Sequence, residues 1–144
     1  MPPVEFPFWE PHEILWLHCL ATTRQDVPDP QEADLQNPER LQLCTNGNAN
    51  AVISACESVK LFVLYNPSAD RFDVAAAYAY YIAVGHVFSN GNKRCAFMAS
   101  LVFLSAYPDF EIERYAARGY DRLIERMVEG EITRDQLAHF LRNN

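Results

Sequence analysis

The chain has 144 residues, of which 12 are Lys or Arg and 19 are Asp or Glu, so its formal net charge is -7. A chain of this length folds most simply as one domain, residues 1–144, that buries roughly two thirds of its unfolded surface without disulfides or metals. The acidic balance argues against attraction of the whole surface to nucleic acid or to an anionic membrane. We therefore expect neither as a partner, and any phosphate site must be local.

The cysteines and the N-terminus show no mark of secretion. The chain contains no CxxC pair, and we expect reduced thiols at Cys19, Cys44, Cys56 and Cys95. The opening MPPVEFPFWEP lacks the basic-then-apolar order of a secretory signal. The longest apolar run, Cys95 to Tyr107, is well short of the roughly 20 residues that cross a membrane. These features predict a cytoplasmic protein with a short N-terminal extension, residues 1–10.

The first half of the chain predicts two helices separated by a long loop. Pro11 followed by HEILWLHCL is typical of a helix start. Residues 24–50 are rich in Pro, Asp, Gln and Asn and predict an irregular loop, with one short turn around Pro38 to Leu43. Residues 51–60 predict a helix, whereas the apolar run 61–65 is β-prone and its period does not decide between helix and strand.

The second half predicts four more helices. Phe72 to Val84 is apolar on all sides, which predicts a deeply buried helix that stops at Gly85. A second buried helix runs from near Gly91 to Pro108, and residues 113–129 predict a more amphipathic one. The pattern TRDQ, which begins at Thr133, fits a capping box for the last helix. The sum is an all-α fold with six helices.

HVFSNGNKR, residues 86–94, concentrates polar chemistry between the two buried helices. The helix end before it favours a proton on His86, which suits a histidine that accepts a proton in a reaction. The helix after it begins near Gly91 with N–H groups that have no intrahelical acceptor and can bind an anion, and Lys93 and Arg94 add positive charge there. The pattern indicates a general base beside a phosphate site. The same residues also fit simple helix caps and solvated charges, and both interpretations stay open at this point.

HVFSNGNKR resembles the signature of the Fic/Doc superfamily, which runs His, any, Phe, any, Asp or Glu, Gly or Ala, Asn, Gly or Lys, Arg. Lys93 stands where nucleotidyl-transferring Fic proteins usually have glycine, and Phe97 stands where they usually have a second arginine. The chain is therefore similar to the death-on-curing (Doc) toxin branch, over roughly residues 12–141. The resemblance implies a six-helix Fic/Doc-type bundle with a short flap before the central helix pair.

The resemblance also implies a role for individual residues. His86 would take the proton from the target hydroxyl, and Phe88 would anchor the loop in the core. The cradle for the nucleotide phosphates would consist of Gly91, Asn92, Lys93 and Arg94. The flap that clamps an extended target segment would consist of Leu61, Phe62, Val63, Leu64 and Tyr65. The same run fits a buried helix end equally well. The other histidines are assigned to surface or satisfied core positions: His12, His18 and His139.

In the Doc branch the implied reaction is transfer of the γ-phosphoryl group of ATP, with Mg²⁺, to a hydroxyl of a protein target. The implied type of target is elongation factor Tu, so the expected result is arrest of translation. The inhibitory motif of many Fic proteins is missing here, because its nearest match, residues 125–130, begins with Glu instead of Ser or Thr. The expected partner is therefore a separate antitoxin of the Phd type.

One departure from the pattern concerns the metal. Asn90 stands where the family usually has the acid that holds Mg²⁺, and an amide oxygen ligates the ion without a negative charge. Asn90 is therefore only a weak candidate metal ligand. Two alternatives to phosphoryl transfer stay open: Fic-type transfer of AMP to a protein, and a catalytically inert binding module that keeps the fold.

Overall fold

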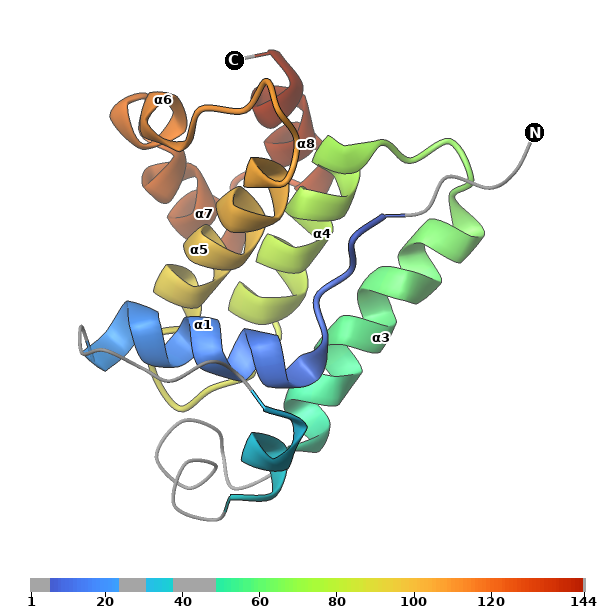
Figure 1. Ribbon diagram of the computed structural model, residues 1–144. Helices are drawn as coiled ribbons and strands as arrows, with labels where there is room; N and C mark the ends of the chain where they lie inside the picture. Colours follow the sequence, from blue (N-terminus) through green and yellow to red (C-terminus); the bar gives the residue numbers. More distant parts are fainter. Residues whose placement is uncertain (1–5, 24–30, 38–48, 144) are drawn as a thin grey trace.

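The computed structural model describes residues 6–23, 31–37 and 49–143, which form an all-α bundle (Figure 1). The elements in chain order are α1 (Pro11–Thr23), the 3-10 helix η1 (Glu32–Gln36), α3 (Asn50–Tyr65), α4 (Arg71–Ala83), α5 (Asn92–Ser105), α6 (Ile112–Ala117), α7 (Tyr120–Val128) and α8 (Arg134–Asn143). The described residues contain no β-strand. The predicted all-α fold class is confirmed.

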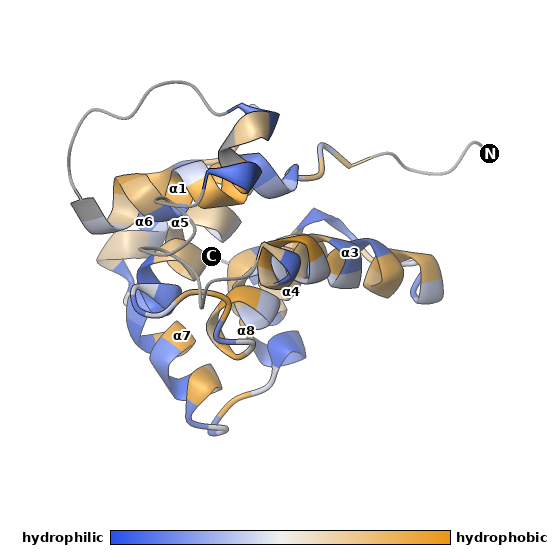
Figure 2. Cartoon of the chain, turned by 90° about the horizontal axis from the view of Figure 1, so that it is seen from below, coloured by the Kyte–Doolittle hydropathy of each residue, from blue (hydrophilic) through white to orange (hydrophobic). Residues whose placement is uncertain are grey.

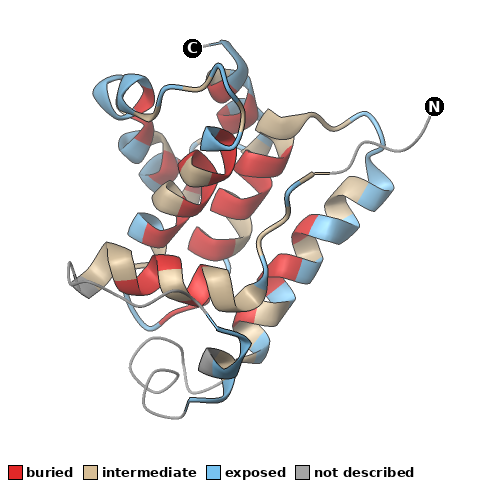
Figure 3. Ribbon diagram, viewed as in Figure 1, coloured by how far each residue is buried: buried red, intermediate tan, exposed pale blue. Residues whose placement is uncertain are grey.

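α4 is the central helix of the bundle. It packs against α3, α5, α7 and α8, and six consecutive residues, Val74 to Ala79, are buried (Figure 3). A helix that is apolar on all sides must be covered on all sides, so the sequence pattern and the position agree. α5 runs beside α4, and the nine-residue signature lies where the chain passes from α4 to α5 at one end of the bundle (Figure 1).

The predicted helix over residues 113–129 is two helices. Gly119 has a φ of 82°, a left-handed conformation that interrupts the helix between Ala117 and Tyr120. The described part of the chain therefore has seven α-helices instead of the six predicted. α7 is amphipathic, with hydrophobic and hydrophilic residues on different sides (Figure 2), and its buried side is formed by Tyr120, Ile124 and Met127.

Residues 61–65 form the last turns of α3 and not an extended flap. Phe62 and Val63 pack against the core, while Leu61, Leu64 and Tyr65 are 50%, 68% and 78% exposed. This spacing is helical, and it overrides the β-propensity of the run because it continues the buried face that Val52 and Val59 begin. These residues precede α4, whereas the signature follows it, so the two lie at opposite ends of α4 (Figure 1).

The long predicted loop contains regular structure. The 3-10 helix Glu32–Gln36 lies inside the range 24–50 and packs against α1. The turn predicted around residues 38–43 lies outside the described residues. In the N-terminal extension, the Trp9 indole N–H donates to the carbonyl of Ala99 at 2.9 Å, which ties the extension to α5. No helix in the described ranges is long and apolar enough to span a membrane.

Side-chain caps define the start of two helices. The capping box predicted from TRDQ is confirmed, because the Gln136 N–H donates to Thr133 Oγ1 at 3.1 Å and the Thr133 N–H donates to Gln136 Oε1 at 2.8 Å. Asp70 and Asp73 form a second box at the start of α4. Each box satisfies main-chain donors that a helix start leaves without an intrahelical acceptor.

Candidate functional site

The signature loop begins at a strained residue. α4 ends at Ala83, and His86 has a φ of 48°, in the left-handed region that costs an ordinary L-residue roughly 1 to 2 kcal/mol. The predicted stop at Gly85 is thus displaced by one residue. Gly85 is needed for another reason, because a Cβ atom there would collide with the carbonyl oxygen of Tyr81. The backbone strain at His86 marks this exposed histidine as a functional candidate.

Phe88 and Asn92 fix the middle of the loop. Phe88 is only 1% exposed and inserts into the core. The Phe88 N–H donates to Asn92 Oδ1 at 2.8 Å, and Asn92 Nδ2 donates to the Phe88 carbonyl at 2.8 Å. The Asn92 side chain is therefore engaged by the loop itself. Its contribution to the predicted phosphate cradle is limited to its main-chain N–H in the first turn of α5.

α1 closes the loop from the opposite side. His18 is buried, its ring stacks on Phe88 with 3.8 Å between centroids, and its Nε2 lies 2.8 Å from the carbonyl oxygen of Asn90. Gly91 is left-handed with a φ of 75°. A Cβ atom on Gly91 would collide with the Thr22 methyl group, so only glycine permits this close approach of loop and helix.

A cavity of about 500 Å³ lies over the start of α5 and is in the size range of small-molecule sites. It brings together five of the predicted site residues and Asn90: the lining consists of Thr22, Ala83, His86, Asn90, Gly91, Asn92, Lys93, Arg94 and Val128. The imidazole of His86, the first-turn N–H groups and two cations therefore face one space. This is the arrangement that a phosphate group and an adjacent hydroxyl would require.

Lys93 and Arg94 also line a second cavity. Its volume is about 490 Å³, and its walls include Phe97 and Met98 from α5 and two acids from α7, Asp121 and Glu125. No ion pair among the described residues engages Lys93 or Arg94. Basic residues at a helix start oppose the helix dipole, so an anionic ligand would turn an unfavourable placement into a favourable one. The two cavities together offer space for a ligand larger than one phosphate.

The structure does not bring all predicted site residues together. The flap candidates of α3 do not line either cavity, and their backbone is engaged in helical hydrogen bonding. Target binding by these residues stays a prediction. Conversely, His18, which the sequence assigns to a surface or satisfied core position, contacts the loop, and Thr22, which no motif marks, lines the first cavity. The pattern of α1 does not distinguish these two residues from its other polar residues, such as His12 and Glu13, so the sequence alone does not indicate their place in the site.

Comparison with known proteins identifies the family of the chain. Residues 9–104, which include α1, α3, α4, the signature loop and most of α5, match the Fic/DOC family. The chain belongs to this family. It is also similar to the protein kinase doc of Escherichia phage P1, with 40% identity over 58 residues, a match that covers 40% of this chain and 44% of that protein. The chain thus matches less than half the length of this relative.

Proposed function

We propose that the protein is a Doc-like toxin that transfers the γ-phosphoryl group of ATP to a hydroxyl group of a protein target. The observation that carries the proposal is the single cavity that collects His86, Gly91, Lys93 and Arg94 at the start of α5. Similarity to a protein kinase of phage P1 favours phosphoryl transfer over other reactions of the family. Lys93 and Phe97, which depart from the nucleotidyl-transferring pattern, point in the same direction.

The residues of the cavity suit the chemistry of phosphoryl transfer. The target oxygen forms a bond to the γ-phosphorus, the bond from that phosphorus to the bridging oxygen breaks, and ADP leaves. His86 accepts the proton of the attacking hydroxyl. The main-chain N–H groups of the first turn of α5 and the charges of Lys93 and Arg94 stabilise negative charge on the phosphate oxygens. Such a reaction needs mainly positioning and electrostatic stabilisation, which a rigid loop provides.

Mg²⁺ fits this site as an ion that arrives with the nucleotide. Asn90 lines the cavity and can offer one amide oxygen, and a phosphate-bound Mg²⁺ needs only one or two protein ligands. The described residues contain no cluster of three or more His, Cys, Asp or Glu side chains that would hold the ion alone. The ion would neutralise charge between the phosphates. Because Asn90 carries no negative charge, we propose that this site binds Mg²⁺ less tightly than a site with an acidic residue at the same position.

The proposed biological role is arrest of translation, with elongation factor Tu as the type of target and a Phd-type antitoxin as the separate inhibitor. The test is inducible expression in a bacterium, with incorporation of a labelled amino acid as the readout. The wild-type chain should stop incorporation, and His86→Ala, an exposed position, should not. Equal incorporation with and without wild-type expression would contradict the role as a toxin.

Transfer of AMP is the second candidate reaction. The second cavity, beside Lys93 and Arg94 and bordered by Phe97, gives room for a nucleoside as well as phosphates, and it favours neither orientation of the nucleotide. The position of the label in ATP separates the two reactions.

A further inference from the structure

We propose that His18 of α1 is a positioning residue of the phosphate site, and that it fixes the orientation of the Asn90–Gly91 peptide bond. The inference rests on the proposed function, because it explains how the anion-binding backbone is held. His18 is 2% exposed, and its Nε2 lies 2.8 Å from the main-chain oxygen of Asn90. A carbonyl oxygen only accepts hydrogen bonds, so the geometry assigns the proton to Nε2. Nδ1 has no partner within the described ranges.

The peptide bond between Asn90 and Gly91 has two faces with opposite electrostatic character. The described part of the chain has no cis peptide, so the Gly91 N–H points away from the Asn90 carbonyl. Because His18 draws this carbonyl toward α1, the N–H is directed away from α1. Rotation of the peptide plane would exchange the two groups. It would place the negative end of the carbonyl dipole near the proposed position of the phosphate, at the start of α5.

Gly91 makes such a rotation possible. Its φ is 75°, and glycine occupies positive and negative φ with similar ease, so the backbone by itself does not resist a change in the preceding peptide. A larger residue would restrict φ, but a Cβ atom at this position would collide with Thr22 and lie 3.2 Å from His18 Nε2. The close packing of α1 thus demands glycine. The hydrogen bond from His18 restrains the freedom that glycine introduces.

The His18 ring is itself held in position. It stacks on Phe88 with an interplanar angle of 15°, and Phe88 is fixed by two hydrogen bonds to Asn92 at the start of α5. The donor on Nε2 is therefore aimed by aromatic packing and not by a flexible chain. His18 links three parts of the site: α1, the buried anchor of the loop, and the peptide that precedes α5.

The experiment uses ¹⁵N-glycine labelling of the whole chain, which contains 5 glycines. The amide nitrogen of Gly91 is bonded directly to the Asn90 carbonyl carbon, so its chemical shift responds to a hydrogen bond at that carbonyl. His18→Phe keeps a ring to stack on Phe88 and removes the donor. His18→Gln keeps an N–H donor at the same distance along the side chain. His12→Phe, on the same helix but outside both cavities, is the matched control.

We expect His18→Phe to move the Gly91 resonance and to weaken Mg·ATP binding, measured by calorimetry, about three- to tenfold, the usual effect of one lost hydrogen bond. His18→Gln should recover most of both, and His12→Phe should change neither. A Gly91 resonance and an ATP affinity in His18→Phe that equal those of wild type would overturn the proposal. Recovery with glutamine is the decisive arm, because loss of ring packing alone predicts the opposite order.

A second pair covers the case in which His18→Phe does not fold. His18→Met matches glutamine in length but has no donor, so the pair His18→Gln and His18→Met isolates the hydrogen bond without the ring. Equal Gly91 shifts in these two variants would also refute the role of His18. A wild-type protein that binds no Mg·ATP would instead contradict the proposed function, and the Gly91 resonance would still show whether His18 holds the peptide.

Discussion

The carboxamide of Asn92 bonds to both main-chain groups of Phe88, with its oxygen accepting from the N–H and its nitrogen donating to the carbonyl, each at 2.8 Å. Asn92 is the first residue of α5, and Phe88 is a buried residue of the loop. The loop is thereby closed on the helix that follows it. The signature asparagine holds the loop in shape, so the proposed phosphate ligand would meet a preformed surface at the start of α5.

Loss of the two hydrogen bonds between Asn92 and Phe88 should destabilise the fold. Asn92→Ala leaves the N–H and the carbonyl of buried Phe88 without their partners, which should lower the free energy of unfolding by about 1 to 3 kcal/mol. Asn92→Asp keeps the acceptor but sets a carboxylate against the Phe88 carbonyl, so it should not restore wild-type stability. Denaturant unfolding measures both. Lys93→Ala, an exposed neighbour, serves as the control. An Asn92→Ala protein as stable as this control would contradict the stabilising role of the Asn92 hydrogen bonds.

Replacing Asn90 with an acidic residue should strengthen metal binding. Asn90→Asp adds a negative charge to the cavity that contains Lys93 and Arg94, while the hydrogen bond from His18 persists because it involves only the main-chain oxygen. We expect tighter Mg²⁺-dependent ATP binding, roughly tenfold or more if the carboxylate gains one charge-assisted contact. Calorimetry with ATP, with and without Mg²⁺, measures the effect. No change in the Mg²⁺-dependent part would argue for an inert binding module.

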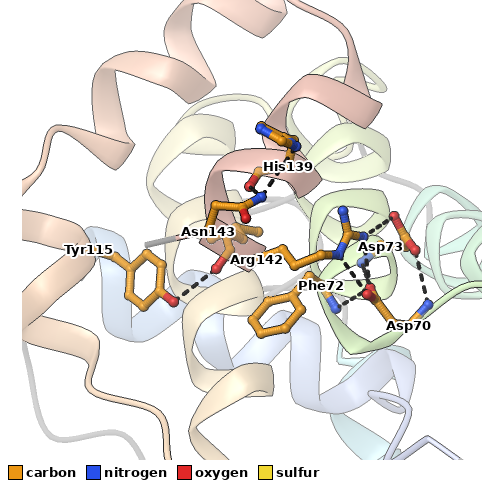
Figure 4. Close-up of polar contacts among 8 residues, drawn as sticks. Asp70, Phe72, Asp73, Tyr115, His139, Arg142 and Asn143 are labelled. Atoms are coloured by element: carbon orange, nitrogen blue, oxygen red, sulfur yellow. Dashed lines mark hydrogen bonds and ion pairs between the residues drawn. The ribbon is translucent and has the colours of Figure 1, made fainter.

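A surface ion pair should make stability depend on acidic pH. Arg142 of α8 donates to Asp70 Oδ2 at 2.7 Å and to Asp73 Oδ1 at 2.9 Å, which links α8 to the start of α4 (Figure 4). Burial alone would raise the pKa of Asp70, but the hydrogen bonds from Arg142 and from the Asp73 backbone, with the charge of Arg142, lower it to about 2. The ionised carboxylate is thus favoured by folding.

The sign of the effect follows from this lowered pKa. The contribution of Asp70 is fully present above its unfolded pKa of about 3.8 and is lost as the pH falls toward about 2. Because the side chains of Arg142 and Asp70 are 37% and 42% exposed, we expect the free energy of unfolding to fall by at most about 1 kcal/mol. Between those pH values, the free energy of unfolding should fall more steeply with decreasing pH for wild type than for Asp70→Asn. Glu131→Gln, in the more exposed pair with Arg126, should leave the pH dependence as it is.

The buried cysteines should be unreactive in the folded protein. Cys19, Cys56 and Cys95 are buried thiols, and desolvation by burial raises the pKa of Cys56 to about 12 and raises that of Cys95 as well. Since the thiolate is the reactive form, a thiol reagent should label none of them at about pH 8 and all of them in denaturant. The measurement uses Cys44→Ser, because Cys44 lies outside the described residues. Rapid labelling without denaturant would contradict the packing of α1, α3 and α5.

The fold was predictable to the extent that local patterns determined it. The apolar sides of α4 and α5 and the box at Thr133 were sufficient to place these helices. The sequence did not show that Gly119 divides 113–129, because an isolated glycine is tolerated within many helices and only its left-handed φ ends one. For residues 61–65, β-propensity competed with helical packing, and packing prevailed because Phe62 and Val63 extend the buried face of α3.

The residues of the site that are close in sequence were predictable, but the contacts between residues far apart in sequence were not. The signature places His86, Gly91, Lys93 and Arg94 within nine residues, so their proximity follows from local sequence. The contact of His18 with Asn90 joins residues 72 positions apart, and no periodicity in α1 indicates it. Likewise, the engagement of the Asn92 side chain by Phe88 depends on the exact turn, which the signature residues alone do not define.

The proposed phosphoryl transfer is tested by finding which phosphate of ATP supplies the label that the protein transfers. Purified wild-type protein and His86→Ala are incubated with Mg²⁺, bacterial lysate and ATP labelled at either the γ or the α phosphate. Phosphoryl transfer by His86 should give a protein band that is labelled only from the γ position and is absent with His86→Ala. A band labelled only from the α position would replace phosphoryl transfer by AMP transfer, and the absence of any band, with Asn90→Asp as well, would contradict an enzymatic role.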